Sequence, residues 1–171
     1  QALELDHQHI EASLGLARIA MSLSMVEQSI AILDRTLGFA PENPDALALR
    51  GLVEEGRGHL EAALDYLRKA AKSGSRSYFA RYHYGRALTV ARSYKEAIHE
   101  LQAAAKLSQN AVAPHYALGV AYKESGKLGE AVTELTRTLE IDPTLLDGYM
   151  TLADVLSEAK RQETAEKVLL Q

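Results

Sequence analysis

The chain repeats itself every 34 residues, and this periodicity constrains its fold more than any other feature. A small residue returns at this interval in one column, which contains Ala17, Gly51, Gly85, Gly119 and Ala153. A second small column contains Ser29, Ala63, Ala97, Ala131 and Ala165, and a third column contains Leu33, Leu67, Leu101, Leu135 and Leu169. The three columns stay in phase without insertion or deletion. Such internal repeats predict a stack of similar units rather than a globule around one core.

Each period predicts two short helices. Residues 112–125 and residues 127–141 both carry apolar side chains at helical spacing. Gly126 interrupts the pattern between them, and Pro143 ends the unit because proline cannot continue a helix. Strands are not expected, since no segment alternates apolar and polar residues over a usable length. The small columns allow the two antiparallel helices to approach to about 8–10 Å, and the leucine column fills the space beside their crossing.

The repeat pattern resembles that of the tetratricopeptide repeat family. In that family a large apolar residue precedes Gly or Ala, and an aromatic residue, an Ala and a final Pro follow. The fourth unit carries this pattern at Leu118, Gly119, Tyr122, Ala131, Leu135 and Pro143. The resemblance implies an all-α fold, a right-handed α-solenoid of stacked antiparallel helix hairpins. We expect residues 1–9 to be the tail of a preceding repeat, 10–43, 44–77, 78–111 and 112–145 to be repeats 1 to 4, and 146–171 to be a partial fifth repeat.

Some positions depart from the family pattern. Repeat 2 has Arg50 and Glu54 where the other repeats have apolar residues, and repeats 2 and 3 have Ser75 and Gln109 where the family has Pro. We therefore expect looser packing near repeats 1 and 2.

Composition excludes several classes of function. The 19 Lys and Arg against 23 Asp and Glu give a net charge of -4, which disfavours nucleic acid as a partner. The absence of Cys excludes thiolate metal sites and cysteine nucleophiles. No stretch approaches the roughly 20 apolar residues of a membrane span, so membrane insertion is not expected. The chain starts at Gln1 rather than Met, and we expect it to be a piece of a larger protein.

No segment carries a complete enzyme motif. Ser125-Gly126-Lys127 lacks the preceding strand and the Ser or Thr of a phosphate-binding loop, which favours a turn. Gly56-Arg57-Gly58 is expected to be the corresponding turn of repeat 2, where glycine supplies positive φ. His7 and His9 could in principle bind a divalent metal, but two His without fixed further ligands favour a solvated segment. We expect no catalysis, no cofactor and no metal.

The family resemblance implies that first helices line a concave groove, chiefly through the second, fifth, ninth and twelfth positions of each repeat. The fifth position holds Leu14, Ala48, Tyr82, Tyr116 and Met150. Around the middle of the chain, aromatic and basic side chains gather at such positions, as they do in binding hot spots. The candidate partner-binding residues are Phe79, Tyr82, Arg86, Tyr116, Val120 and Lys123. From Tyr66 to Lys95 every charged residue is basic, which favours a peptide with an aromatic or apolar anchor and an acidic neighbour.

Several alternatives stay open at this point. Tyr82 and Tyr116 could merely pack against adjacent helices. A carboxylate-clamp role is disfavoured because the Asn residues of that clamp are missing from the matching positions. The chain could instead be a module that self-assembles through its open ends, or the regulatory arm of an enzyme whose catalytic domain lies elsewhere. The leading interpretation is a protein-interaction scaffold that binds a partner peptide or domain.

Overall fold

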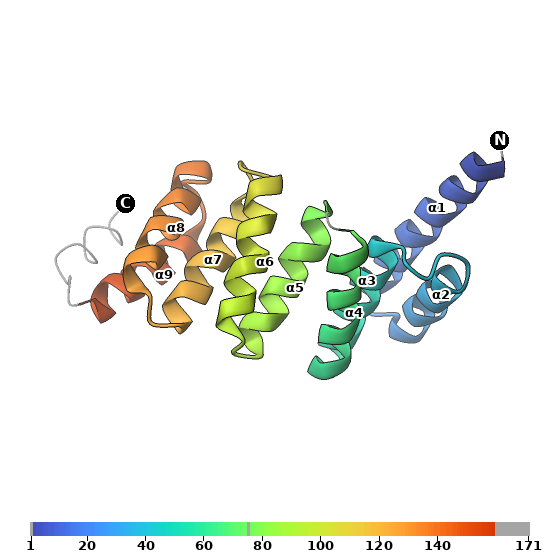
Figure 1. Cartoon of the computed structure of the whole chain (residues 1–171), viewed down its shortest axis with the longest axis horizontal. Helices are drawn as coiled ribbons and strands as arrows, with labels where there is room; N and C mark the ends of the chain where they lie inside the picture. Colours follow the sequence, from blue (N-terminus) through green and yellow to red (C-terminus); the bar gives the residue numbers. More distant parts are fainter. Residues whose placement is uncertain (1, 75, 160–171) are drawn as a thin grey trace. The chain divides into compact units, whose positions relative to one another are not determined.

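The computed structural model describes residues 2–74 and 76–159, and side chains from residue 9 onward. Within these residues the chain forms helices and no strand, so the predicted all-α class is confirmed (Figure 1). The helices are α1 (Ala2–Ser22), α2 (Val26–Phe39), α3 (Pro44–Gly56), α4 (Leu60–Ser73), α5 (Tyr78–Val90), α6 (Tyr94–Leu107), α7 (Val112–Glu124), α8 (Leu128–Ile141) and α9 (Leu146–Glu158). Odd-numbered helices are the first helices of the repeats, and even-numbered helices are the second helices.

The first helix of the chain is longer than its counterparts. Helix α1 has 21 residues, whereas α3 and α7 have 13 each. Residues 2–9, which the sequence assigns to the tail of a preceding repeat, form the first turns of this helix. The repeat boundaries themselves stay a prediction.

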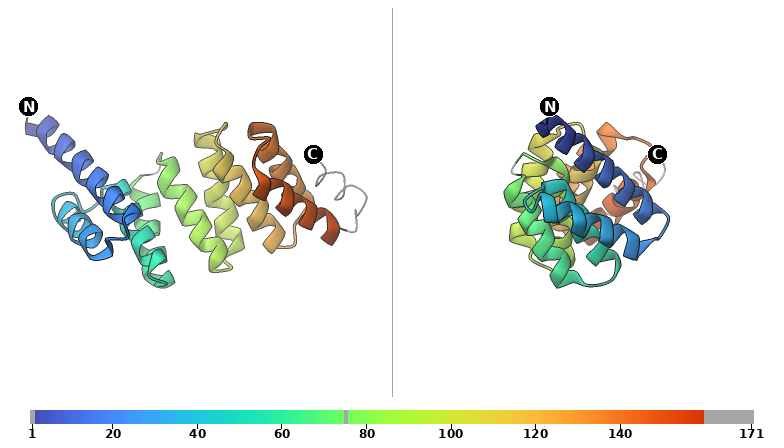
Figure 2. Two further views of the ribbon diagram at one scale, coloured as in Figure 1. Left: turned by 180° about the vertical axis from the view of Figure 1, so that it is seen from behind. Right: turned by 90° about the vertical axis from the view of Figure 1, so that its right-hand side faces the viewer.

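The chain divides into two compact units, Gln1–Ala87 and Leu88–Gln171, and the division falls inside α5. In unit 1 the pairs α1–α2 and α3–α4 pack in succession, with α2 and α1 both against α3. In unit 2 the pair α7–α8 is flanked by α6 against α7 and by α9 against α8. Figure 2 shows the antiparallel course of the helices within each pair.

The small columns lie where two helices of a pair cross. A Cβ atom on Gly51 would lie 2.7 Å from Leu67 Cγ, and one on Gly119 would lie 2.6 Å from Leu135 Cγ. Both leucines are fully buried. Each glycine therefore permits a close approach that an added Cβ atom would obstruct, and the sequence predicts a small residue at this crossing. Ala165 and Leu169, the last members of their columns, lie outside the described residues.

Helix ends follow local chemistry. The Asn43 side chain accepts a hydrogen bond from the backbone N–H of Ala46 at 2.9 Å and so caps α3, whose first residue is Pro44. In the turns that follow α3 and α7, Gly58 has φ +80° and Gly126 has φ +76°. Glycine adopts this left-handed conformation without steric cost. Both predicted turns are confirmed.

The two charged departures of repeat 2 are buried. Arg50 is 8% exposed and Glu54 is 5% exposed. Their side chains form an ion pair, and Arg50 Nε donates to Asp34 Oδ1 of α2 at 2.9 Å. The Arg50 hydrogen bond, helped by His59 and by the charges of Arg50 and Arg57, lowers the pKa of Glu54 to about 2 against the opposing effect of burial.

The expected looser packing is wrong for the α3–α4 pair. The close approach of Gly51 to Leu67 matches that of Gly119 to Leu135, and Leu49 and Val53 are buried beside it. Arg50 and Glu54 can be buried because each supplies the opposite charge and the hydrogen-bond partner that the other needs. The helices of the pair therefore do not separate.

Candidate protein-interaction surface

The six candidate residues fall into two sets, one in each unit. Phe79, Tyr82 and Arg86 lie on α5 in unit 1 and form the α5 set. Tyr116, Val120 and Lys123 lie on α7 in unit 2 and form the α7 set. All six are neither fully buried nor fully exposed.

In the α5 set, Phe79 packs against the core of unit 1. Its ring packs against the apolar cluster that includes Leu14 of α1 and Leu49 of α3. The guanidinium carbon of Arg18 lies 6.0 Å from the ring centroid, at the limit of a cation–π contact. Phe79 therefore contributes to the stacking of first helices as well as to their surface.

Tyr82 stands in a row of aromatic rings along α5. It stacks in parallel on Tyr78, with ring centroids 5.9 Å apart, and meets the edge of the His83 ring at 4.8 Å. His83 also contacts Phe79 at 4.4 Å. These contacts leave Tyr82 half-buried and hold its ring in one orientation.

His83 is a residue that sequence reasoning missed. Its Nδ1 atom is buried and has no hydrogen-bond partner. Burial, together with the charge of Arg86, lowers the pKa of His83 to about 4, so the ring is neutral at pH 7. A neutral imidazole packs as an aromatic ring, and it separates Phe79 from Tyr82 in the row. No motif around His83 distinguishes it from the surface histidines.

The cation of the α5 set is already paired within the unit. Arg86 Nη2 donates to Glu55 Oε1 of α3 at 2.7 Å. Glu55 was not among the six candidate residues, although its position on α3 corresponds to a groove position of the family. An acidic group of a partner would therefore compete with Glu55 for Arg86.

In the α7 set, Tyr116 is tied to the next first helix. Its phenol oxygen lies 3.1 Å from Thr151 Oγ1 of α9. Val120 lies one turn further along α7 and is half-buried. The tyrosine ring thus has a fixed position, and its partial exposure leaves one part of it accessible.

Lys123 is also paired within its unit. Its Nζ atom lies 3.3 Å from Asp154 Oδ2 and 3.5 Å from Glu158 Oε1, both on α9. Burial opposes the charge, but the hydrogen bonds and the charges of the two carboxylates raise the pKa of Lys123 above its ordinary value. Neither Arg86 nor Lys123 stands as an unpaired cation.

The fifth repeat position is buried in two repeats and accessible in the other three, where Met150 is 53% exposed. Leu14 is 5% exposed and Ala48 is 0% exposed, so this position belongs to the core in repeats 1 and 2. Tyr82 and Tyr116 are only half-buried at the same position. The groove positions that the family resemblance implies are therefore not all surface positions in this chain.

The remaining histidines have ordinary roles. His115 Nδ1 of α7 lies 2.8 Å from Glu134 Oε2 of α8, a contact that joins the two helices of the pair. His9 and His99 are exposed, and the side chain of His7 lies outside the described residues. Among the described side chains, no three or more His, Cys, Asp or Glu are grouped so as to hold a metal ion.

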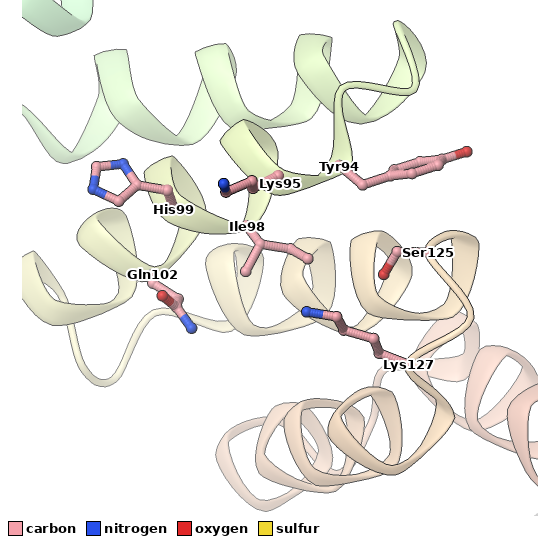
Figure 3. Close-up of a pocket in the computed structure, with 7 residues that line it drawn as sticks. All are labelled: Tyr94, Lys95, Ile98, His99, Gln102, Ser125 and Lys127. Atoms are coloured by element: carbon pink, nitrogen blue, oxygen red, sulfur yellow. The ribbon is translucent and has the colours of Figure 1, made fainter.

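A shallow pocket of about 400 Å³ lies on another part of unit 2 (Figure 3). Its lining comes from the second helix α6 and from the turn between α7 and α8, and contains Tyr94, Lys95, Ile98, His99, Gln102, Ser125 and Lys127. None of the six candidate residues contributes to it. The pocket therefore has no part in the predicted binding surface.

Comparison with known families identifies the repeat. The model of a tetratricopeptide repeat family matches residues 14–78, 49–112 and 82–145. The chain belongs to the tetratricopeptide repeat family. This confirms the predicted resemblance, and with it the fold class of stacked helix hairpins. The fold is typical of protein-interaction scaffolds, and its members are generally adaptors rather than enzymes.

One curated relative is anaphase-promoting complex subunit 3 of Schizosaccharomyces pombe. It is 22% identical over 142 residues, which are 83% of this chain and 21% of that protein. The chain thus spans about a fifth of the length of this relative. The similarity is therefore limited to one part of that protein.

Several solved structures share the fold. PilF of Pseudomonas aeruginosa superposes with a TM-score of 0.86 at 21% identity, covering 97% of this chain and 77% of that one. MamA of Desulfovibrio magneticus RS-1 gives 0.83 at 18% identity, covering 95% and 92%. YrrB, described as a tetratricopeptide repeat protein with an unusual peptide-binding site, gives 0.76 at 22% identity, covering 91% and 80%. At these identities the similarity shows the fold alone.

One property of the helices bears on membranes. Within the described part of the chain, none of the helices has both the length and the apolar character needed to cross a bilayer.

Proposed function

We propose that this chain is a scaffold that binds a protein or peptide through the first helices α5 and α7. The observation that carries the proposal is the pair of tyrosines at one repeat position. Tyr82 and Tyr116 are half-buried, whereas the equivalent Leu14 and Ala48 are buried. Tyrosines that are held in place and partly exposed provide contact area at little cost in side-chain entropy.

Apolar contact is expected to supply most of the binding free energy. Phe79, Tyr82, Tyr116 and Val120 offer rings and a branched side chain, while the two cations are already neutralised by carboxylates. A partner with an aromatic or large apolar anchor fits this chemistry. An acidic neighbour on the partner would gain contact with Arg86 or Lys123 only by displacing Glu55 or Asp154, so it should refine specificity more than affinity. YrrB, which shares the fold, is described as having a peptide-binding site, so a peptide is a kind of ligand that this fold can bind.

The test begins with a displayed library of random peptides, selected on the 171-residue chain. The selected peptides should share a large apolar or aromatic residue. Their affinity should fall at least tenfold, about 1.4 kcal/mol, for the variants Tyr82→Ala and Tyr116→Ala. Tyr94→Ala is the matched control, because Tyr94 lies at the start of the second helix α6. Binding is measured by fluorescence anisotropy, with helical content checked by circular dichroism.

A second variant pair tests the acidic neighbour. Glu55→Gln releases Arg86 from its ion pair, and Asp154→Asn removes one of the two carboxylates beside Lys123. A peptide whose acidic residue contacts Arg86 should bind more tightly to Glu55→Gln, and a peptide whose acidic residue contacts Lys123 should bind more tightly to Asp154→Asn. A library that returns no binder, or binders unaffected by loss of either tyrosine, would overturn the proposal.

A further inference from the structure

The shallow pocket of unit 2 differs in charge from the predicted binding surface. Its lining includes Lys95 of α6 and Lys127 of the α7–α8 turn, and no acidic side chain. Arg86 and Lys123 of the predicted surface are paired with carboxylates. Among the side chains that the structure describes, no ion pair joins Lys95 or Lys127 to a carboxylate. An acidic ligand therefore reaches the two pocket lysines without displacing an internal partner.

The lining residues come together from α6 and from the α7–α8 turn. Lys95, His99 and Gln102 follow one another at helical spacing and share one face of α6. In Figure 3 the side chain of Lys127 extends from the turn toward α6, and Ile98 lies between it and Lys95. Ile98 is 9% exposed, so the pocket has an apolar residue at its base and basic residues around it.

Nearby acidic side chains do not neutralise the two lysines. Glu96 and Glu100 of α6 do not line the pocket, and both have other interaction partners. Glu100 Oε1 lies 3.3 Å from His99 Nδ1. We therefore assign the positive charge of the pocket to Lys95 and Lys127, and not to His99.

One buried ring positions residues from both sides of the pocket. Gln102 Nε2 of α6 donates to the phenol oxygen of Tyr122 at 2.9 Å. Lys127 Nζ lies 5.9 Å from the centroid of the same ring, within cation–π range. Tyr122 is 8% exposed. A cation held in this way loses less side-chain freedom when a ligand binds.

The fold itself does not require these lysines. The position of Lys95 holds an acidic residue or glycine in repeats 1, 2 and 4, at Glu27, Glu61 and Gly129. The position of Lys127 holds other residue types in repeats 1 to 3, at Met25, His59 and Ser93. The second helices α2, α4 and α8 form all the same. The repeat architecture therefore gives no structural reason for two cations at this pocket.

We propose that this pocket binds an acidic peptide segment of a partner protein. Two carboxylates of the segment contact Lys95 and Lys127, and an apolar side chain between them lies against Ile98. Nucleic acid is disfavoured, because its phosphates attract a longer row of cations and the net charge of the chain is -4. The proposal does not rest on binding through α5 and α7, since none of the six candidate residues lines the pocket.

The test begins with a displayed library of short peptides rich in Asp and Glu, selected on the 171-residue chain. Affinities are measured by fluorescence anisotropy for the unaltered chain and for Lys95→Glu and Lys127→Ser. Other repeats carry Glu and Ser at these positions, so both variants should fold, which circular dichroism checks. Lys106→Glu is the matched control, because Lys106 is exposed in the last turn of α6 and does not line the pocket.

The selected peptides should bind about tenfold more weakly once Gln and Asn replace their Glu and Asp. Lys95→Glu should also weaken binding by about tenfold, because it turns an attraction into a repulsion. Lys127→Ser should weaken it by roughly threefold, the value of one exposed ion pair. Lys106→Glu should change the affinity by less than about twofold, since salt screens a distant exposed charge.

This site and the first-helix surface fail separately. Tyr82→Ala and Tyr116→Ala should leave the affinity for the acidic peptides unchanged. A library that returns no acidic binder overturns the proposal, and so do binders that bind Lys95→Glu as tightly as the unaltered chain. A single-stranded oligonucleotide that binds more tightly than the peptides, with the same dependence on Lys95 and Lys127, would show that the ligand is a nucleic acid instead.

Discussion

The same junction is built around a buried ion pair in unit 1 and around a buried leucine and tyrosine in unit 2. Around the start of the α3–α4 turn, Arg50 and Glu54 are buried and are joined by Asp34 and His59. Two repeats later the equivalent residues are Leu118, Tyr122, Gln102 and Lys127. There Gln102 Nε2 donates to the Tyr122 phenol oxygen at 2.9 Å, and Lys127 Nζ lies 5.9 Å from the ring centroid.

The comparison shows that the fold needs side chains that fill the space at these positions. An ion pair or a leucine with a tyrosine can fill it. In unit 2, Leu118 and Tyr122 fill it with apolar volume and one hydrogen bond. In unit 1 the same space is filled by Arg50 and Glu54, which must neutralise each other to be buried. A buried ion pair seldom stabilises a fold more than apolar residues of similar volume. The charged solution is therefore the more sensitive to losing one member.

The largest expected effect is the loss of Glu54. Glu54→Ala leaves the Arg50 guanidinium buried with Asp34 as its remaining partner, and should lower the free energy of unfolding by about 3 kcal/mol. Replacing both residues by their unit 2 equivalents, in the double variant Arg50→Leu with Glu54→Tyr, should restore or exceed the original stability. Urea unfolding followed by circular dichroism measures both. A single variant as stable as the parent would show that the charges are not coupled.

Acid should weaken unit 1 by the same route. The pKa of Glu54 is about 2 in the folded chain and about 4.5 as an ordinary carboxyl group. Because the folded value is lowered, the stabilisation is present above pH 4.5 and is lost as the pH falls toward 2, up to about 3 kcal/mol. Urea midpoints between pH 6 and pH 2.5 should fall less in the double variant Arg50→Leu with Glu54→Tyr than in the unaltered chain. Parallel pH curves would contradict this assignment.

The helix crossings should respond alike in the two units. Gly51→Ala and Gly119→Ala place a Cβ against a fully buried leucine, and each should cost about 1 kcal/mol after the gain in helix propensity. Gly129→Ala on α8 is the control: nothing lies within 4 Å of its added Cβ, so stability should rise. The readout is the urea midpoint. Unequal costs for Gly51 and Gly119 would show that the crossings differ despite their matching geometry.

The smallest effect is expected in unit 2. Tyr122→Phe removes the phenol that accepts from Gln102 and keeps the buried ring. The cost should be about 0.5–1 kcal/mol, because exposed Gln102 can turn to water instead. Thermal or urea unfolding measures it, with Tyr94→Phe as the control. If Tyr122→Phe lowered the free energy of unfolding as much as Glu54→Ala, the junctions of the two units would be equally sensitive to the loss of one polar partner.

The candidate site was only partly predictable. Its residues could be chosen because repeat position determines which side of a first helix a residue occupies, and Tyr82 and Tyr116 are indeed accessible there. The partners of these residues could not be predicted, since Arg86 pairs with Glu55, which lies 31 residues earlier in the sequence and on another helix. Nothing near His83 in the chain indicates that its Nδ1 atom is buried.

The 34-residue period alone determined the helical hairpins, their crossings and the family. It could do so because Gly or Ala opposite Leu is a local requirement that each repeat meets within its own pair of helices. Tertiary structure decided what happens between pairs: that Arg50 and Glu54 are compatible with tight packing, and that the candidate cations are neutralised. Those outcomes depend on which side chains meet across neighbouring helices, and burial and pairing there follow from the assembled contacts rather than from any single segment.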